Sequence, residues 1–121
     1  MERIVKRGSG WRLGWDATAP EYKGMVSGAD WSLELTATEF QEFRRMVNQL
    51  ANTLQQMAAE LMDEEKITCE LESELLWMSV EGYPHAYDLR FILRTGRRGE
   101  GAWPATAIAE LVPALQTLQV F

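Results

Sequence analysis

The order of hydrophobic periodicities repeats along this chain: segments of alternating apolar and polar residues precede a helical segment, and the same order then recurs. Alternation with a period of two is typical of half-buried strands, and apolar spacings of three and four are typical of an amphipathic helix. The sequence therefore predicts an α+β fold, in which one curved antiparallel sheet of about six to eight strands packs against two helices. The halves share element order but no visible sequence identity, so a duplicated strand–helix unit rests on that order alone.

The alternating segments are predicted to be strands. They span residues 11–16, 22–27, 31–35, 67–72, 75–81 and 87–94. In the first segment, Trp11, Leu13 and Trp15 share one face, so we expect their side chains in the core. Cys69 falls on the apolar side of the fourth segment, where a cysteine usually acts as a small hydrophobe.

A long central helix is predicted from about Thr36 to Leu61. It opens on a capping box, in which Thr36 and Glu39 each satisfy the other's backbone N–H, and its apolar residues recur every three or four positions. Packing of this apolar stripe against the sheet is favoured, and pairing with a second subunit is the alternative. A second helix is predicted to open at Trp103-Pro104, with Pro104 suited to its first position, and to be kinked or restarted at Pro113, which lacks the N–H donor.

The bulk composition favours one acidic domain. The chain has 121 residues, of which 46% are hydrophobic and 25% charged, and its formal net charge is -6. This length suggests a single domain over residues 1–121, and the negative balance argues against strong non-specific binding to nucleic acid or anionic lipid. A lone cysteine excludes an internal disulfide. The N-terminus is too polar for a signal peptide, and no apolar run approaches about 18 residues, so we expect a cytoplasmic protein without membrane partners.

No residue set in the sequence has the spacing of a catalytic or metal site, so we predict no enzyme activity, no metal and no cofactor. His85 lies beside Pro84 in a predicted turn, without a partner that would orient it as a general base. Glu70 and Glu72 share one strand face and could hold a hard cation, but a solvated face explains them more simply. A small enzyme is the least favoured hypothesis.

A group of arginines near the end of the last predicted strand is the strongest candidate for ligand binding. The predicted ligand-binding residues are Arg90, Arg94, Arg97, Arg98 and Trp103. Arginine beside aromatic residues is typical of single-stranded nucleic-acid sites, which combine phosphate contact with base stacking. The alternative is cross-strand pairing of two of these arginines with neighbouring acids. Such pairs would join Arg90 and Arg94 to Glu70, Glu72 or Glu81.

Two functions therefore stay open. The first is a non-enzymatic binding module that takes single-stranded nucleic acid or an acidic protein segment on the exposed sheet face and the loop at residues 96–101. The second is a protein–protein assembly or regulatory subunit, as a homodimer or with another partner, that binds no nucleic acid. In that case the acidic run from Glu60 to Glu74 presents the partner surface.

Several motifs resemble a small family from cyanobacteria and plastid-bearing plants that is known only as a domain of unknown function. The motifs are Gly10–Asp16, Asp30-Trp31, Glu34–Thr36, Glu39-Phe40, Glu60–Glu65, Trp77, Gly82, Leu89–Leu93, Arg98 and Glu100-Gly101 with Trp103, within a span from Gly8 to Leu118. The resemblance implies a Whirly-like fold, similar to that of single-stranded-DNA-binding transcriptional regulators, with curved antiparallel sheets and a repeated strand–helix unit. It assigns no activity and so implies no catalytic residue.

Overall fold

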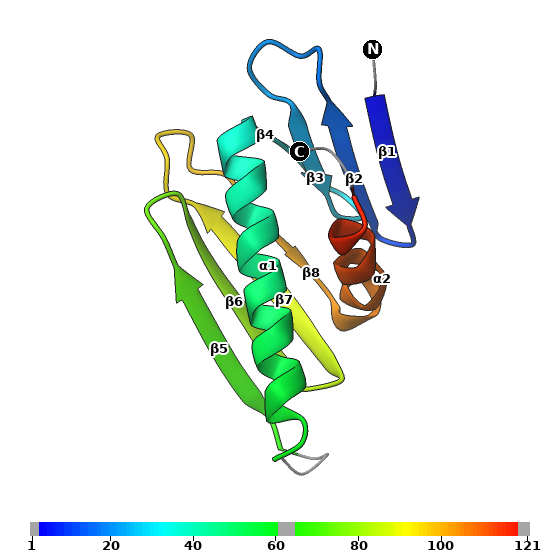
Figure 1. Cartoon of the computed structure of the whole chain (residues 1–121), viewed down its shortest axis with the longest axis vertical. Helices are drawn as coiled ribbons and strands as arrows, with labels where there is room; N and C mark the ends of the chain where they lie inside the picture. The colour runs from blue at the N-terminus through cyan, green and yellow to red at the C-terminus, as the bar shows by residue number, and fades with distance from the viewer. Residues whose placement is uncertain (1–2, 61–64, 119–121) are drawn as a thin grey trace.

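The computed structural model describes residues 3–60 and 65–118. Its elements follow the same order twice, four strands and then a helix (Figure 1). The first half contains β1 (Arg3–Gly8), β2 (Trp11–Asp16), β3 (Gly24–Ser27), β4 (Ser32–Leu35) and α1 (Ala37–Met57). The second half contains β5 (Ile67–Glu72), β6 (Leu76–Tyr83), β7 (Ala86–Leu93), β8 (Glu100–Trp103) and α2 (Ala105–Gln116). The α+β class is confirmed, and the order of elements agrees with the predicted strand–helix duplication.

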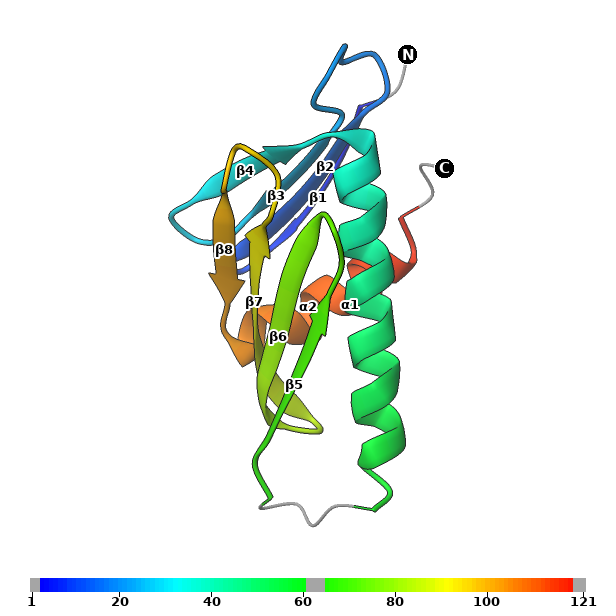
Figure 2. The ribbon, with the colours of Figure 1, turned by 90° about the vertical axis from the view of Figure 1, so that its left-hand side faces the viewer.

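The strands form two separate sheets, which corrects the prediction of one continuous sheet. Each sheet is an antiparallel meander, in the order β1-β2-β3-β4 or β5-β6-β7-β8. Figure 2 shows β4 of the first sheet beside β8 of the second, and these edge strands are in contact. The Trp31 indole donates there to the Ala102 carbonyl oxygen at 3.2 Å and packs on Gly101, where a Cβ would overlap the ring. A side-chain contact therefore joins the sheets where a backbone ladder would have merged them.

The sequence patterns do not predict two of the edge strands, β1 and β8. β1 is rich in charged residues (Arg3, Lys6 and Arg7), and it owes its extended conformation to antiparallel pairing with β2 along its whole length. β8 lies in a segment whose glycines predict a loop, but Gly101 is the residue that lets the Trp31 ring approach the strand. In both strands tertiary contacts outweigh the local pattern, as is common for β structure.

α1 begins as predicted and ends earlier. The capping box is confirmed: the Glu39 N–H donates to Thr36 Oγ1 at 3.2 Å, and the Thr36 N–H donates to Glu39 Oε1 at 2.9 Å. The helix ends at Met57, before the predicted end at Leu61, which lies outside the described residues. Most of the predicted stripe is buried, namely Phe40, Phe43, Val47, Leu50 and Leu54. The stripe packs within the chain, because α1 contacts β5 and β6 of the second sheet and β3 and β4 of the first.

One hydrophobic cluster contains residues of both sheets and both helices. The ring centroids of Phe43 on α1 and Phe91 on β7 lie 5.2 Å apart, and they lie 5.9 Å and 5.6 Å from the Trp103 ring. α2 packs against β7 and also contacts β1 and β2, so it bridges the two sheets (Figure 1). This helix continues through Pro113 as one element, and the kink expected there stays a prediction.

Candidate binding face of the second sheet

The outer face of the second sheet is the surface that the sequence predicts as a binding site. Alternation along the strands turns Met78, Val80, Leu89 and Phe91 inward, where they are buried. The outward side chains are Thr68, Glu70 and Glu72 on β5, Trp77, Ser79 and Glu81 on β6, Asp88, Arg90 and Ile92 on β7, and Glu100 and Ala102 on β8. We call this set the acidic face, because its five carboxylates outnumber Arg90, the one guanidinium that these strands place among them.

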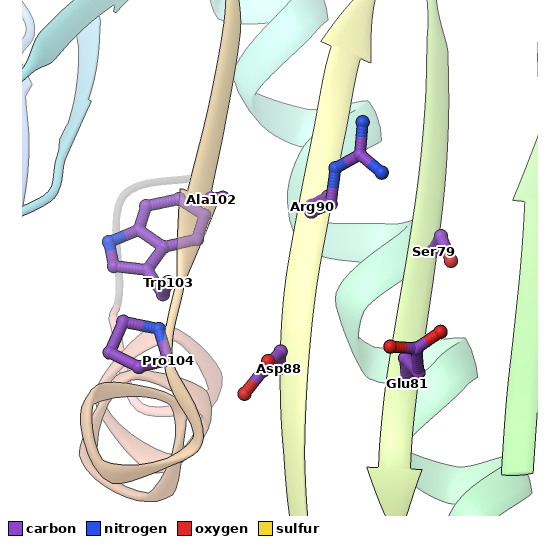
Figure 3. Close-up of a pocket in the computed structure, with 7 residues that line it drawn as sticks. All are labelled: Ser79, Glu81, Asp88, Arg90, Ala102, Trp103 and Pro104. Atoms are coloured by element: carbon purple, nitrogen blue, oxygen red, sulfur yellow. The ribbon is translucent and has the colours of Figure 1, made fainter.

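Arg90 occupies the middle of the acidic face, opposite Ser79 on β6 and Ala102 on β8. Its guanidinium carbon lies 5.6 Å from the centroid of the Trp77 ring, within the range of a cation–π contact. A hollow of about 320 Å³ opens beside it, and its lining includes Glu81 and Asp88. Figure 3 shows the Arg90 side chain directed away from these two carboxylates. The hollow therefore has an acidic end and a separate guanidinium end.

Two carboxylates face each other across strands at the acidic end of this hollow. Glu81 is the register partner of Asp88, and like charges directly opposite each other destabilise a strand pair. The Asp88 carboxylate accepts from the Ala105 N–H at 3.0 Å and so caps the start of α2. Glu81 lies 3.8 Å from the ammonium of Lys66, and both of these side chains are more than half exposed. Both carboxylates stay accessible, because the Lys66–Glu81 pair is exposed and Asp88 uses one oxygen for the cap.

Arg94 pairs with an acid, as the alternative interpretation of the arginines predicts. Its Nη1 donates to the Ser73 carbonyl oxygen at 2.8 Å and lies 3.4 Å from the Glu72 carboxylate. These contacts hold the start of the β7–β8 loop against the β5–β6 turn. Arg94 therefore has a local structural role in addition to its place at the rim of the acidic face.

Arg97 is tied to the first half of the chain instead of facing a ligand. Its Nη2 donates to the carboxylate of Glu39, which is only 4% exposed. Its Nη1 donates to the Glu34 carbonyl oxygen at 2.8 Å, and its guanidinium carbon lies 4.7 Å from the centroid of the Tyr22 ring. Glu39 also accepts from Thr95 Oγ1 at 3.1 Å. The capping residue of α1 thus anchors the β7–β8 loop, a second role that the sequence does not reveal.

Trp103 and Arg98 have opposite environments. Trp103 is 1% exposed and donates from Nε1 to the Ser27 carbonyl oxygen at 2.9 Å. Its prediction as a surface contact is therefore wrong, because the ring forms part of the core. Arg98 is exposed and has a left-handed backbone, with φ of 55°. Among the described residues, no side chain pairs with its guanidinium.

The remaining residues considered for chemistry form no cluster. Over residues 3–60 and 65–118, no group of three or more His, Cys, Asp or Glu side chains could hold a metal ion. Cys69 is a half-buried free thiol that packs against the core. His85 lies in the two-residue turn between β6 and β7. Asp63 and Glu64, which belong to the predicted acidic partner surface, lie outside the described residues.

None of the described helices is both long and apolar enough to span a membrane. No curated protein matches the chain. A solved structure of a protein of unknown function from Prochlorococcus sp. NATL2A, described as a DUF155 family protein, superposes with a TM-score of 0.89 and 28% sequence identity, covering 94% of this chain and 97% of that one. Residues 6–118 match the family described as a domain of unknown function, DUF1818. The chain therefore belongs to the DUF1818 family.

Proposed function

We propose that this protein is a non-enzymatic binding module that takes a basic segment of another protein on the acidic face. The observation that carries this proposal is the excess of five carboxylates over Arg90 and the flanking cations Lys66 and Arg94 on the solvent side of β5–β8, around a hollow. Opposite charges steer encounter and fix register at a protein interface. This function belongs to the class of assembly or regulatory subunits that the sequence leaves open.

The apolar part of the acidic face suits the same partner. Trp77 and Ile92 are register partners, and both are half-buried between the carboxylates. Lysine and arginine side chains place their aliphatic stems on apolar surface while the charged head reaches a carboxylate or water. Aromatic residues are also enriched at interfaces. A basic segment could therefore use the centre of the face for its stems and Glu70 or Glu100 at the edges for its charges.

Single-stranded nucleic acid or an acidic protein segment, the ligands expected from the arginine group, remain predictions for this face. Their support is weaker, because Arg94 and Arg97 are engaged within the chain and Trp103 is buried. Arg90 and Arg98 are left, and phosphate binding depends on neutralising several charges at once.

The Whirly-like fold is likewise a proposal, supported by the repeated order of four strands and a helix. A cytoplasmic location stays part of the proposal as well.

The experiment compares three labelled probes by fluorescence anisotropy: an oligolysine peptide, an oligoglutamate peptide and a single-stranded DNA oligonucleotide. We expect the oligolysine peptide to bind, and to bind more weakly as salt rises, because exposed charges are screened. The double variant Glu70→Gln/Glu100→Gln should weaken this binding about fivefold, from about 0.5 kcal/mol for each exposed charge pair. The matched control is Glu74→Gln, an exposed acid in the β5–β6 turn.

Two results would contradict the proposal. One is a complete absence of oligolysine binding at low salt. The other is equal weakening by the double variant and by the Glu74→Gln control, which would mean that net charge alone attracts the peptide. Tighter binding of the DNA oligonucleotide, lost in Arg90→Ala and Arg98→Ala, would favour the nucleic-acid prediction instead.

A further inference from the structure

The outer face of the first sheet carries a pair of positive charges, opposite in sign to the carboxylates of the acidic face. Arg7 on β1 is the register partner of Arg12 on β2, and both are exposed. Arg12 Nε donates to Ser27 Oγ at 3.2 Å, whereas no described side chain neutralises the Arg7 guanidinium. Opposed guanidinium groups destabilise a strand pair unless an anion lies between them or near them. We call Arg7 and Arg12 the arginine pair.

The arginine pair has a counterpart of matching geometry on the second sheet. Glu81 and Asp88 are also directly opposed on neighbouring antiparallel strands. Directly opposed residues have Cβ atoms about 4.5–5.5 Å apart in any antiparallel pair, so the two pairs share the same spacing. Lys66 and the Ala105 N–H offset only part of the charge of the acidic pair, and contact between the two pairs would offset the charge of both.

We infer that the basic partner of the acidic face is a second copy of this chain, whose arginine pair docks on Glu81 and Asp88. This inference rests on the function proposed above and names the partner. The hollow beside these carboxylates offers room for incoming guanidinium groups, and Arg90 is directed away from that end (Figure 3). Val5, which is 37% exposed on the same outer face as Arg7, adds an apolar contact.

The two docking surfaces lie on different sheets, so the contact is heterologous. Every copy carries one arginine pair and one acidic face, and a bound copy still offers its unused surface to a further copy. Such an interface generates a ring if the rotation between copies closes and an open series if it does not. We therefore expect the average mass to rise with concentration, and to fall with salt because the groups involved are exposed.

The test uses the full chain in sedimentation velocity over a wide concentration range. The double variant Arg7→Glu/Arg12→Glu should be monomeric, since both of its faces are then acidic. The double variant Glu81→Arg/Asp88→Asn should also be monomeric, while the amide oxygen at position 88 can still accept from the start of α2. Mixed in equal amounts, the two variants should associate again. The arginine pair of the second variant can dock on the acidic face of the first, and the new glutamates of the first can meet the new arginine of the second. Circular dichroism melts verify that both variants are folded.

Exposed charges elsewhere provide the matched control. The double variant Glu74→Arg/Arg98→Glu reverses one acid and one arginine away from both pairs, and it should associate as the wild-type chain does. A wild-type mass that stays monomeric at every concentration would overturn the inference, as would reversal variants that associate unaided. If that monomer still binds the oligolysine peptide, the proposed function stands without this partner. If it binds no oligolysine, both fail.

Discussion

The contact between Arg97 and Glu39 makes the sharpest prediction about stability. Glu39 is 4% exposed and accepts from the Thr36 N–H, Thr95 Oγ1 and Arg97 Nη2. Replacing Arg97 by alanine removes the one cationic donor among these and leaves a carboxylate in a site with little water. The β7–β8 loop also loses its bond to the Glu34 carbonyl oxygen. We therefore expect Arg97→Ala to lower the free energy of unfolding.

The size of the loss follows from burial on both sides of the contact. Breaking a fully buried ion pair by removing one partner costs about 3–5 kcal/mol. The Arg97 side chain is 31% exposed, so its site is partly solvated already, and two neutral donors to Glu39 remain. We expect about 2–3 kcal/mol for Arg97→Ala, to which the lost contact with the Tyr22 ring contributes about 0.5 kcal/mol. Arg97→Lys should lose about half as much, because the compact ammonium keeps the charge but lacks the planar fork that reaches the Glu39 carboxylate and the Glu34 carbonyl oxygen together.

The assay is urea unfolding at neutral pH, followed by tryptophan fluorescence. With a slope of about 1–3 kcal/mol per molar urea for a small domain, the midpoint should fall by about 1 M without a change in slope. Arg98→Ala, the exposed neighbour in the same loop, is the matched control and should stay within about 0.5 kcal/mol of the wild type. A double-mutant cycle with Glu39→Gln should give a coupling of at least about 1 kcal/mol. Equal midpoints for Arg97→Ala and Arg98→Ala would refute the reasoning.

Three further predictions concern other parts of the fold. Gly101→Ala places a Cβ against the Trp31 ring and should lower stability by about 1–3 kcal/mol in thermal melts. The control is Gly96→Ala, whose Cβ would have no atom within 4 Å. Equal melting temperatures for the two variants would contradict the packing argument. Burial raises the pKa of Tyr87 above its ordinary 10.0, so the unfolded chain ionises first, and stability present below about pH 10 should fall as pH rises through the raised value. Tyr87→Phe should remove that alkaline loss in urea titrations, and an unchanged pH profile would exclude Tyr87 as its source. Asp88→Ala should cost about 1 kcal/mol through the lost cap of α2, and Asp88→Asn clearly less; an unfolding midpoint of Asp88→Ala equal to that of the wild type would show that the cap contributes nothing.

The candidate site could be predicted only where strand alternation decides which way a side chain faces. Arg90 is outward because its neighbours along β7, Leu89 and Phe91, are inward and buried. Arg97 lies in a loop, where no period applies, and its partner Glu39 is distant in sequence. Trp103 has the residue type of a stacking platform, but its burial depends on the Ser27 carbonyl oxygen across the core. Residue type alone therefore overestimated the number of arginines and aromatic rings available to a ligand.

The two helices mark the boundary between what the sequence by itself determined and what the tertiary structure decided. α1 carries its own signals: a capping box between neighbours and an apolar stripe with the helical period. Both act over three or four residues, so they can be recognised without knowing the fold. They place the start of the helix and its buried face correctly.

α2 has no capping box, because its N-cap residue is Pro104, and its local cap is Thr117 Oγ1, which donates to the Pro113 carbonyl oxygen at 3.1 Å. Asp88 on β7 accepts from the first N–H of the helix. At the other end, Lys6 on β1 donates to the Ala114 carbonyl oxygen at 3.2 Å, and Arg44 on α1 donates to that of Gln116 at 3.2 Å. The N–H and carbonyl groups left unpaired at the ends of a helix need partners, whether these lie near or far in the sequence. Periodicity thus determined the elements and their faces, while the partition into two sheets, the anchoring of the arginines and the other caps of α2 came from contacts between distant residues, which only the folded chain brings together.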